Sequence, residues 1–139
     1  MEVEIKKHNN LKTQADTILY FLQRLDIDMV NDILDDSRTY QDFEKSLFIH
    51  KLGNALIKFL EAGDTFLNCH GGFCNSELCN FRCTGFSFIG NKSKNYLDLI
   101  IDIKEGVVHD MYECSDFKFI HERSIKNNRI RIHEFKFRL

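Results

Sequence analysis

The sequence lacks any long apolar run. No stretch approaches the length of about eighteen consecutive apolar residues that a membrane helix needs. Its opening, MEVEIKKHNN, is charged and has neither the apolar core nor the small-residue cleavage site of a secretory signal peptide. We therefore expect a soluble, cytoplasmic protein with no membrane partner.

Familiar catalytic signatures are also missing. The sequence has no phosphate-binding glycine loop, no His-Glu-x-x-His pair and no nucleophile elbow. No set of titratable residues converges in a recognised pattern, so we expect binding rather than catalysis. Proline is absent too, which reflects genome composition more than fold.

What the sequence does have is enough apolar material for a core. Hydrophobic residues make up 43% of the 139 positions, and thirteen of them are phenylalanine. This composition excludes a disordered or fibrous chain. A chain of this length buries roughly two-thirds of its unfolded surface, so we predict one domain spanning residues 1–139.

Charge is unevenly distributed over the chain, whose net charge is −2. Residues 115–139 carry seven Lys or Arg against three acids, which makes them a basic C-terminal extension. Such a segment could bind phosphates, so nucleic-acid binding through this tail is one alternative function. The charges alternate with apolar residues, however, which is typical of a strand with one solvated face. We therefore favour the strand and regard nucleic acid as an unlikely partner.

Hydrophobic periodicity predicts helices first and strands afterwards. Helical spacing covers residues 13–25, 26–36 and 42–62, and Gly63 is the expected stop of the longest helix. The apolar face of that helix is predicted to hold Phe43, Leu47, Leu52, Leu56, Phe59 and Leu60. Alternation then predicts an antiparallel meander of strands over 64–69, 85–90, 96–103 and 107–114. The fold class is α+β, with N-terminal helices packed on a curved antiparallel β-sheet.

One run of sequence resembles a known architecture. DIDMVNDILDDSRTYQDFEKSLFIHKLGNALIKFL contains a short helix and then Tyr40 leading into a long helix. With the strands that follow, it resembles the nuclear transport factor 2-like cone fold, also called cystatin-like, over about residues 14–114. The resemblance implies a cone-like sheet whose mouth forms a pocket, used by some members as an enzyme site and by many for binding or dimerisation. A cone-pocket isomerase, dehydratase or cyclase is therefore an alternative function.

The cysteine-rich loop over residues 68–83 contains the strongest candidate site. It reads CHGGFCNSELCNFRC from Cys69, with three or four residues between successive cysteines and with Gly71 and Gly72 available for tight turns. Thiolates at such spacing can wrap one tetrahedral zinc ion, and cytosolic cysteines stay reduced. We predict a structural zinc bound by Cys74, Cys79 and Cys83, with Cys69 as the preferred fourth ligand and His70 as its substitute. Cys69 is preferred because we expect it to lie beside Cys83 if strands 64–69 and 85–90 pair.

Other roles for these cysteines remain open at this point. They could form one or two disulfides, include a redox or nucleophilic thiol, or be unliganded side chains, since free cysteine packs as a small hydrophobe. The fifth cysteine, Cys114, is expected to lie about 20 Å from Cys83 along the predicted strands and to pack within a strand. Four thiolates would leave no position for water, so the predicted zinc is structural.

The two faces of the strand over 96–103 differ in character. Period 2 places Tyr96, Asp98 and Asp102 on one face and Leu97, Leu99, Ile101 and Ile103 on the other. If helices cover the leucine side, the aspartates face solvent or a partner subunit, and solvent is the favoured interpretation. If the sheet is reversed, Asp98, His109 or Glu113 could line a pocket as acid or base.

The same strand pattern suggests self-association. The open face carries Tyr96, Ile100 and Tyr112, which is more apolar surface than a monomer usually exposes. We therefore predict a homodimer, the commonest soluble assembly.

Overall fold

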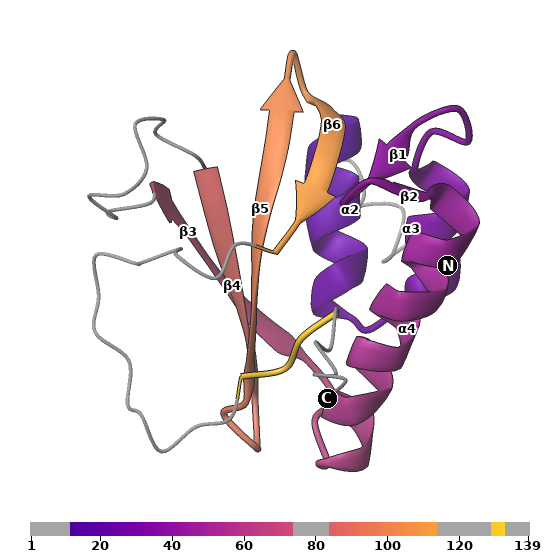
Figure 1. The fold of residues 1–139 in the computed structure, drawn as a ribbon. Helices are drawn as coiled ribbons and strands as arrows, with labels where there is room; N and C mark the ends of the chain where they lie inside the picture. The colour runs from indigo at the N-terminus through magenta and orange to yellow at the C-terminus, as the bar shows by residue number, and fades with distance from the viewer. Residues whose placement is uncertain (1–11, 74–83, 114–128, 133–139) are drawn as a thin grey trace, which may run out of the picture.

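The computed structural model describes residues 12–73, 84–113 and 129–132. Within these ranges the helices α2, α3 and α4 form one layer and a four-stranded antiparallel sheet forms the other (Figure 1). The α+β class is therefore confirmed. None of the described helices is long and apolar enough to cross a membrane.

The first two helices begin at side-chain caps. Helix α2 (Gln14–Gln23) starts where the Asp16 amide donates to Thr13 Oγ1, and α3 (Ile27–Ile33) starts where the Met29 amide donates to Asp26 Oδ1. A cap of this kind satisfies an amide that has no partner inside the helix. Both helices agree with the predicted segments.

The third helix begins later than predicted. Residues 42–44 are not helical, because a two-stranded hairpin of β1 (Thr39–Tyr40) and β2 (Phe43–Glu44) precedes α4 (Lys45–Glu61). Its turn places Gln41 and Asp42 at positive φ. Gln41 holds the hairpin against the sheet, since its amide donates to Asp110 Oδ1 and its side-chain oxygen accepts from the Glu113 amide, both at 3.0 Å. Gly63 ends the helix region at φ +93°, as expected.

The buried face of α4 also differs from the prediction. Leu52, Leu56 and Phe59 lie in the core as expected, but Leu47 and Leu60 are 45% and 50% exposed. The other buried apolar positions of the helix are Phe48 and Ala55. The contacting face is therefore rotated from the expected stripe.

The strands form the predicted meander in the order β3-β4-β5-β6. They are β3 (Leu67–Phe73), β4 (Thr84–Gly90), β5 (Tyr96–Lys104) and β6 (Val107–Tyr112). Strand β3 extends four residues further than predicted, through two glycines that the sequence suggested as turn residues. A register shift lies between Asp102 and Ile103 in the pairing of β5 with β6.

An aspartate from the short link between α4 and β3 holds the turn between β4 and β5. Asp64 is 1% exposed, and its Oδ1 accepts from the amides of Lys92 and Ser93, both at 2.8 Å. Its Oδ2 accepts from Ser93 Oγ at 2.5 Å. A side chain on Gly90 would clash with this carboxylate, so the turn closes tightly only because that position is glycine.

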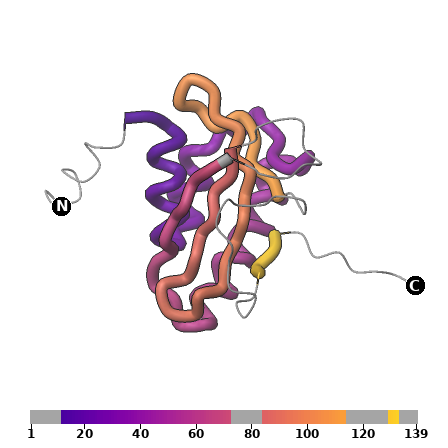
Figure 2. The backbone as a smooth tube through the Cα atoms, turned by 90° about the vertical axis from the view of Figure 1, so that its left-hand side faces the viewer, coloured from indigo at the N-terminus to yellow at the C-terminus, as the bar shows by residue number. Residues whose placement is uncertain are grey.

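The inner face of the sheet packs against the helices. Leu97, Leu99 and Ile101 of β5 are at most 1% exposed and belong to one core with α2 and α4. Figure 2 shows the strands in front of the helix layer in a view turned from Figure 1. The leucine side of β5 therefore faces the helices, as the favoured interpretation of the sequence predicted.

A short segment near the C-terminus joins this core. Arg129 forms a parallel bridge with Tyr96, and the Ile130 amide donates to the Tyr96 carbonyl at 2.7 Å. Ile130 and Ile132 are each 6% exposed in the core cluster. The rest of the predicted C-terminal extension, together with Cys114, lies outside the described residues.

Candidate functional site

The cysteine-rich loop falls mostly outside the described residues. Cys74, Cys79 and Cys83 belong to segment 74–83, which is not described. Its two described neighbours, Phe73 and Thr84, are paired with each other across β3 and β4. The segment therefore joins the sheet at two adjacent positions.

Cys69 does not occupy its expected place. It pairs with Phe88, four residues before Phe73, so it lies about 13 Å along the strand from the pair that flanks the loop. Cys69 therefore lies within β3 and not at its end, where the sequence placed it, because β3 continues to Phe73. The expected neighbour of Cys69, Cys83, lies outside the described residues, so their predicted proximity stays a prediction.

Cys69 and His70 point to opposite faces of the sheet. Cys69 packs against the hydrophobic core, and burial raises the pKa of its thiol to about 11. His70, the next residue, is exposed on the face away from the helices. Within residues 12–73, 84–113 and 129–132, no three His, Cys, Asp or Glu side chains gather closely enough to hold a metal.

A row of polar residues crosses the outer face of the sheet. His70 pairs with Ser87, and Ser87 pairs with Asp98 on the next strand. Ser87 Oγ donates to Asp98 Oδ1 at 2.5 Å. A serine nucleophile requires histidine between serine and aspartate, whereas here the serine lies in the middle. The row is thus not arranged as a catalytic triad.

The burial of this row contradicts the expectation for Asp98. We expected a solvated carboxylate, but Asp98 is 5% exposed and Ser87 is 1% exposed. Ile100, on the same face, is 3% exposed. The apolar surface expected for a dimer is therefore smaller than the sequence suggested.

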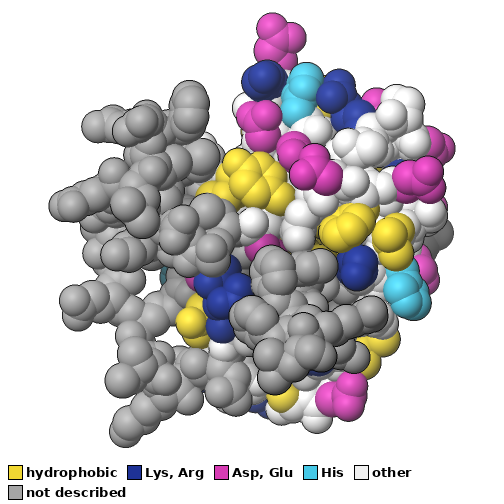
Figure 3. Space-filling model, in the orientation of Figure 1, with side chains coloured by type: hydrophobic (Ala, Val, Ile, Leu, Met, Phe, Trp, Pro, Cys, Tyr) yellow, Lys and Arg dark blue, Asp and Glu magenta, His cyan; other side chains and the backbone are white. Residues whose placement is uncertain are grey.

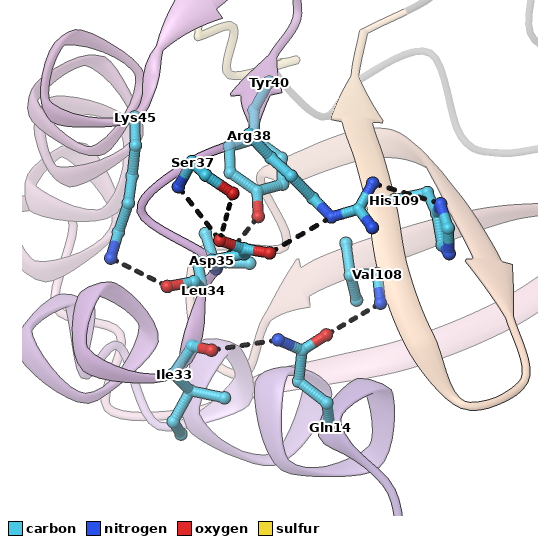
Figure 4. A network of polar contacts seen from close by, with 10 residues as sticks. All are labelled: Gln14, Ile33, Leu34, Asp35, Ser37, Arg38, Tyr40, Lys45, Val108 and His109. Atoms are coloured by element: carbon cyan, nitrogen blue, oxygen red, sulfur yellow. Dashed lines mark hydrogen bonds and ion pairs between the residues drawn. The ribbon is translucent and has the colours of Figure 1, made fainter.

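Another titratable candidate, His109, lies apart from Asp98, near the other end of β5. His109 Nδ1 is 3.1 Å from Arg38 Nη1, and Arg38 Nε is 3.4 Å from Asp35 Oδ2 (Figure 4). Hydrogen bonds from the amide and hydroxyl of Ser37 lower the pKa of Asp35. These contacts tie the loop after α3 to β6, and they do not form an acid–base pair with Asp98.

A hollow of about 380 Å³ lies beside this network, where β1 and α4 meet. Its two cations, Arg38 and Lys45, already have acidic neighbours. Lys45 is 9% exposed, and its ammonium donates to the Leu34 carbonyl at 2.8 Å and contacts Asp36. Among the described residues that line this hollow, neither charge is in excess, since Glu44 and Asp36 balance the two cations.

A second hollow, of about 500 Å³, lies between α4 and the segment 129–132. We call it the α4 groove. Ala55 and Ile132, both buried, are its apolar lining, and Ile57 stands beside them with 48% of its surface exposed. The apolar part of the groove thus comes from two segments far apart in sequence.

Charged side chains surround the α4 groove. Lys51, Lys58 and Arg131 line it with one carboxylate, Glu61. The ammonium of Lys51 lies 5.2 Å from the centre of the Phe43 ring, a cation–π contact that positions it. Figure 3 shows apolar side chains next to basic and acidic ones on the side of the molecule formed by α4.

Sequence reasoning missed the α4 groove. The helical spacing of Lys51, Ile57 and Lys58 was available, but we read the helix as buried along a different stripe. The contribution of Arg131 and Ile132 depends on the parallel bridge of Arg129 to Tyr96, which no local pattern predicts.

Comparison with known proteins gives no match. No protein-family model, curated protein or solved structure shows significant similarity to this chain. Any function must therefore be argued from the residues themselves.

Proposed function

We propose that this protein is a small, non-catalytic α+β binding module, stabilised by a structural zinc ion in the cytoplasm. The observation that carries the binding role is the α4 groove, an open hollow with apolar and charged walls. By contrast, fully buried side chains such as Leu97 and Phe59 fill the space between the helices and the sheet. That packing argues against a cone-pocket enzyme, whose substrate would need this space.

The zinc ligands we propose are Cys74, Cys79 and Cys83, with His70 as the fourth. The pairing of Phe73 with Thr84 supports a closed loop, because it brings the two ends of segment 74–83 to neighbouring positions. His70 is preferred to Cys69 because it is exposed, whereas Cys69 packs on the core. About 10 Å of strand separates His70 from Phe73, a distance that three or four extended residues cover.

Elemental analysis tests the zinc site. Protein purified under reducing conditions without chelator should hold about one zinc per chain, and Cys79→Ser should abolish it. The helical circular dichroism signal should persist, because the described core does not include the loop. Cys114→Ser is the matched control and should retain the zinc. Metal content near zero in the wild-type protein would refute the proposal.

Substitution of the fourth ligand gives a finer test. His70→Ala should weaken zinc binding, while Cys69→Ala should leave the zinc content unchanged. The opposite result would restore Cys69 as the ligand. It would then require the core around Phe88 to open, because the two residues are paired.

We also keep two finer proposals from the sequence. Helices followed by an antiparallel meander are the element order of the nuclear transport factor 2-like fold, which supports that resemblance. A homodimer through the outer face of the sheet follows from Tyr96 and Tyr112, each partly exposed there. Sedimentation that gives only the 16.4 kDa species would rule the dimer out.

A further inference from the structure

We infer that the α4 groove binds an acidic, amphipathic peptide segment of another protein. This inference rests on the proposed binding function and names the class of ligand and the surface that holds it. Its first support is the sign of the charge. Among the described residues that line the groove, three cations and one carboxylate give a formal charge of +2, whereas the whole chain carries −2.

Opposite charge gives an acidic ligand a favourable approach to this surface. The groove is a local basic region on a protein of net negative charge, so it attracts carboxylates. Charges at the edge of an interface mainly set the encounter rate and the choice of partner. The cations of the groove therefore select for Asp and Glu.

Exposed apolar side chains supply the second support. Within the described ranges, Leu47, Ile57 and Leu60 are the large apolar residues with the most exposure, from 45% to 50%, and all three lie on α4. Ile57 lines the groove beside the buried Ala55 and Ile132. Protein interfaces commonly combine such an apolar centre with a polar rim. A ligand with apolar anchors between its acids matches both features.

Other occupants fit less well. Proteins that bind single-stranded nucleic acid stack bases on exposed aromatic rings, whereas no aromatic residue is among the described lining of the groove. In a twofold contact through the groove, a second copy of this chain would present the same basic surface to the first. Like charges at short range oppose that arrangement.

Peptide selection followed by titration tests the inference. A random peptide library is selected on the full-length wild-type protein, and the enriched peptide is synthesised with a fluorescent label for anisotropy measurements. Enriched peptides should combine Asp or Glu with large apolar residues. Binding should weaken steeply between about 0.1 M and about 1 M salt, because the Debye length falls from about 10 Å to about 3 Å.

Variants then locate the binding surface. Lys58→Glu and Ile57→Ser, both at exposed positions, should each raise the Kd by about tenfold, whereas Lys104→Glu should leave it unchanged. Lys104 is an exposed lysine at the far end of β5, about 26 Å along the strand from Tyr96. Circular dichroism confirms that each variant is folded.

Three results would overturn the inference. The first is that the selection enriches neutral peptides, basic peptides or no peptide. The second is that Lys104→Glu weakens peptide binding as much as the groove variants do. The third is that a labelled single-stranded oligonucleotide binds more tightly than the peptide and displaces it. If the Kd of an enriched acidic peptide is the same for the groove variants and the wild type, the groove is not the binding surface, although the protein still has a binding function. The zinc content is measured separately, so failure of the groove and failure of the proposed module are distinguishable.

Discussion

Replacing Asp64 by alanine should destabilise the protein strongly for a position outside the hydrophobic core. Asp64 accepts three hydrogen bonds from the β4–β5 turn, two from backbone amides at 2.8 Å and one from Ser93 Oγ at 2.5 Å. Hydrogen bonds to a charged group contribute about 1.5–3 kcal/mol each, although water replaces part of that near the surface. We expect the free energy of unfolding to fall by about 3 kcal/mol.

Thermal unfolding followed by circular dichroism measures this effect. For a chain of this size, 1 kcal/mol shifts Tm by about 3 °C, so Asp64→Ala should lower Tm by about 10 °C. Asp64→Asn keeps an oxygen acceptor but loses the charge, so it should lower the free energy of unfolding by about half as much as Asp64→Ala does. Asp32→Ala, at an exposed position of α3, removes the same charge and should change stability by less than about 0.5 kcal/mol.

The effect of Asp64 should also depend on pH. Burial alone would raise the pKa of this carboxyl, but hydrogen bonds from Ser93 and Lys92 outweigh burial and lower it. The folded pKa then lies below the unfolded value of about 3.9. The stabilisation is fully present above the unfolded pKa and is lost as the pH falls through the folded pKa. The stability difference between wild type and Asp64→Asn should therefore shrink below about pH 4.

Two results would refute this reasoning. One is a Tm for Asp64→Ala no lower than that of Asp32→Ala. The other is a difference between wild type and Asp64→Asn that stays constant as the pH falls to about 2, because a protonated carboxyl resembles the amide.

The remaining predictions concern the contacts of α2 with its neighbours. In urea denaturation, Gly106→Ala should lower the free energy of unfolding by about 2–3 kcal/mol, and Gly63→Ala should lower it by about 1 kcal/mol. Both glycines have positive φ, but only a Cβ at position 106 would approach another side chain, at 2.6 Å from Thr13 Cγ2. Equal costs would show that this contact is unimportant. Gln14→Ala should cost about 2 kcal/mol, because the Gln14 side chain accepts from the Val108 amide and donates to the Ile33 carbonyl. Gln14→Glu keeps only the acceptor, so hydrogen exchange at the Val108 amide should rise in the alanine variant alone.

The sequence predicted the type and order of the main elements because their periodicity is strong. It misplaced the start of α4 because Phe43 fits the helical spacing and the turn at Gln41 and Asp42 has no glycine. Contacts of Gln41 with Asp110 and Glu113, distant in sequence, favour the hairpin instead. Such tertiary contacts override local preference.

The candidate sites were harder to predict than the fold. Gly71 and Gly72 suggested a turn, but pairing with Phe86 and Gly85 keeps them in β3 and moves Cys69 away from the loop. Asp98 alternated as a surface residue should, yet it is buried with Ser87. In both cases the outcome depends on neighbours across the sheet, which periodicity along one strand does not specify.

The docking of Ile130 and Ile132 has a consequence for translation. Because synthesis runs from the N-terminus, α4 and β5 leave the ribosome well before the segment that bridges Arg129 to Tyr96 and covers part of the core. A nascent chain that ends before this segment has an incomplete hydrophobic core. It also lacks Arg131 and Ile132, which line one side of the α4 groove. The described parts of the core and of the groove are therefore completed at the same step of synthesis, so a partially made chain lacks one wall of the α4 groove.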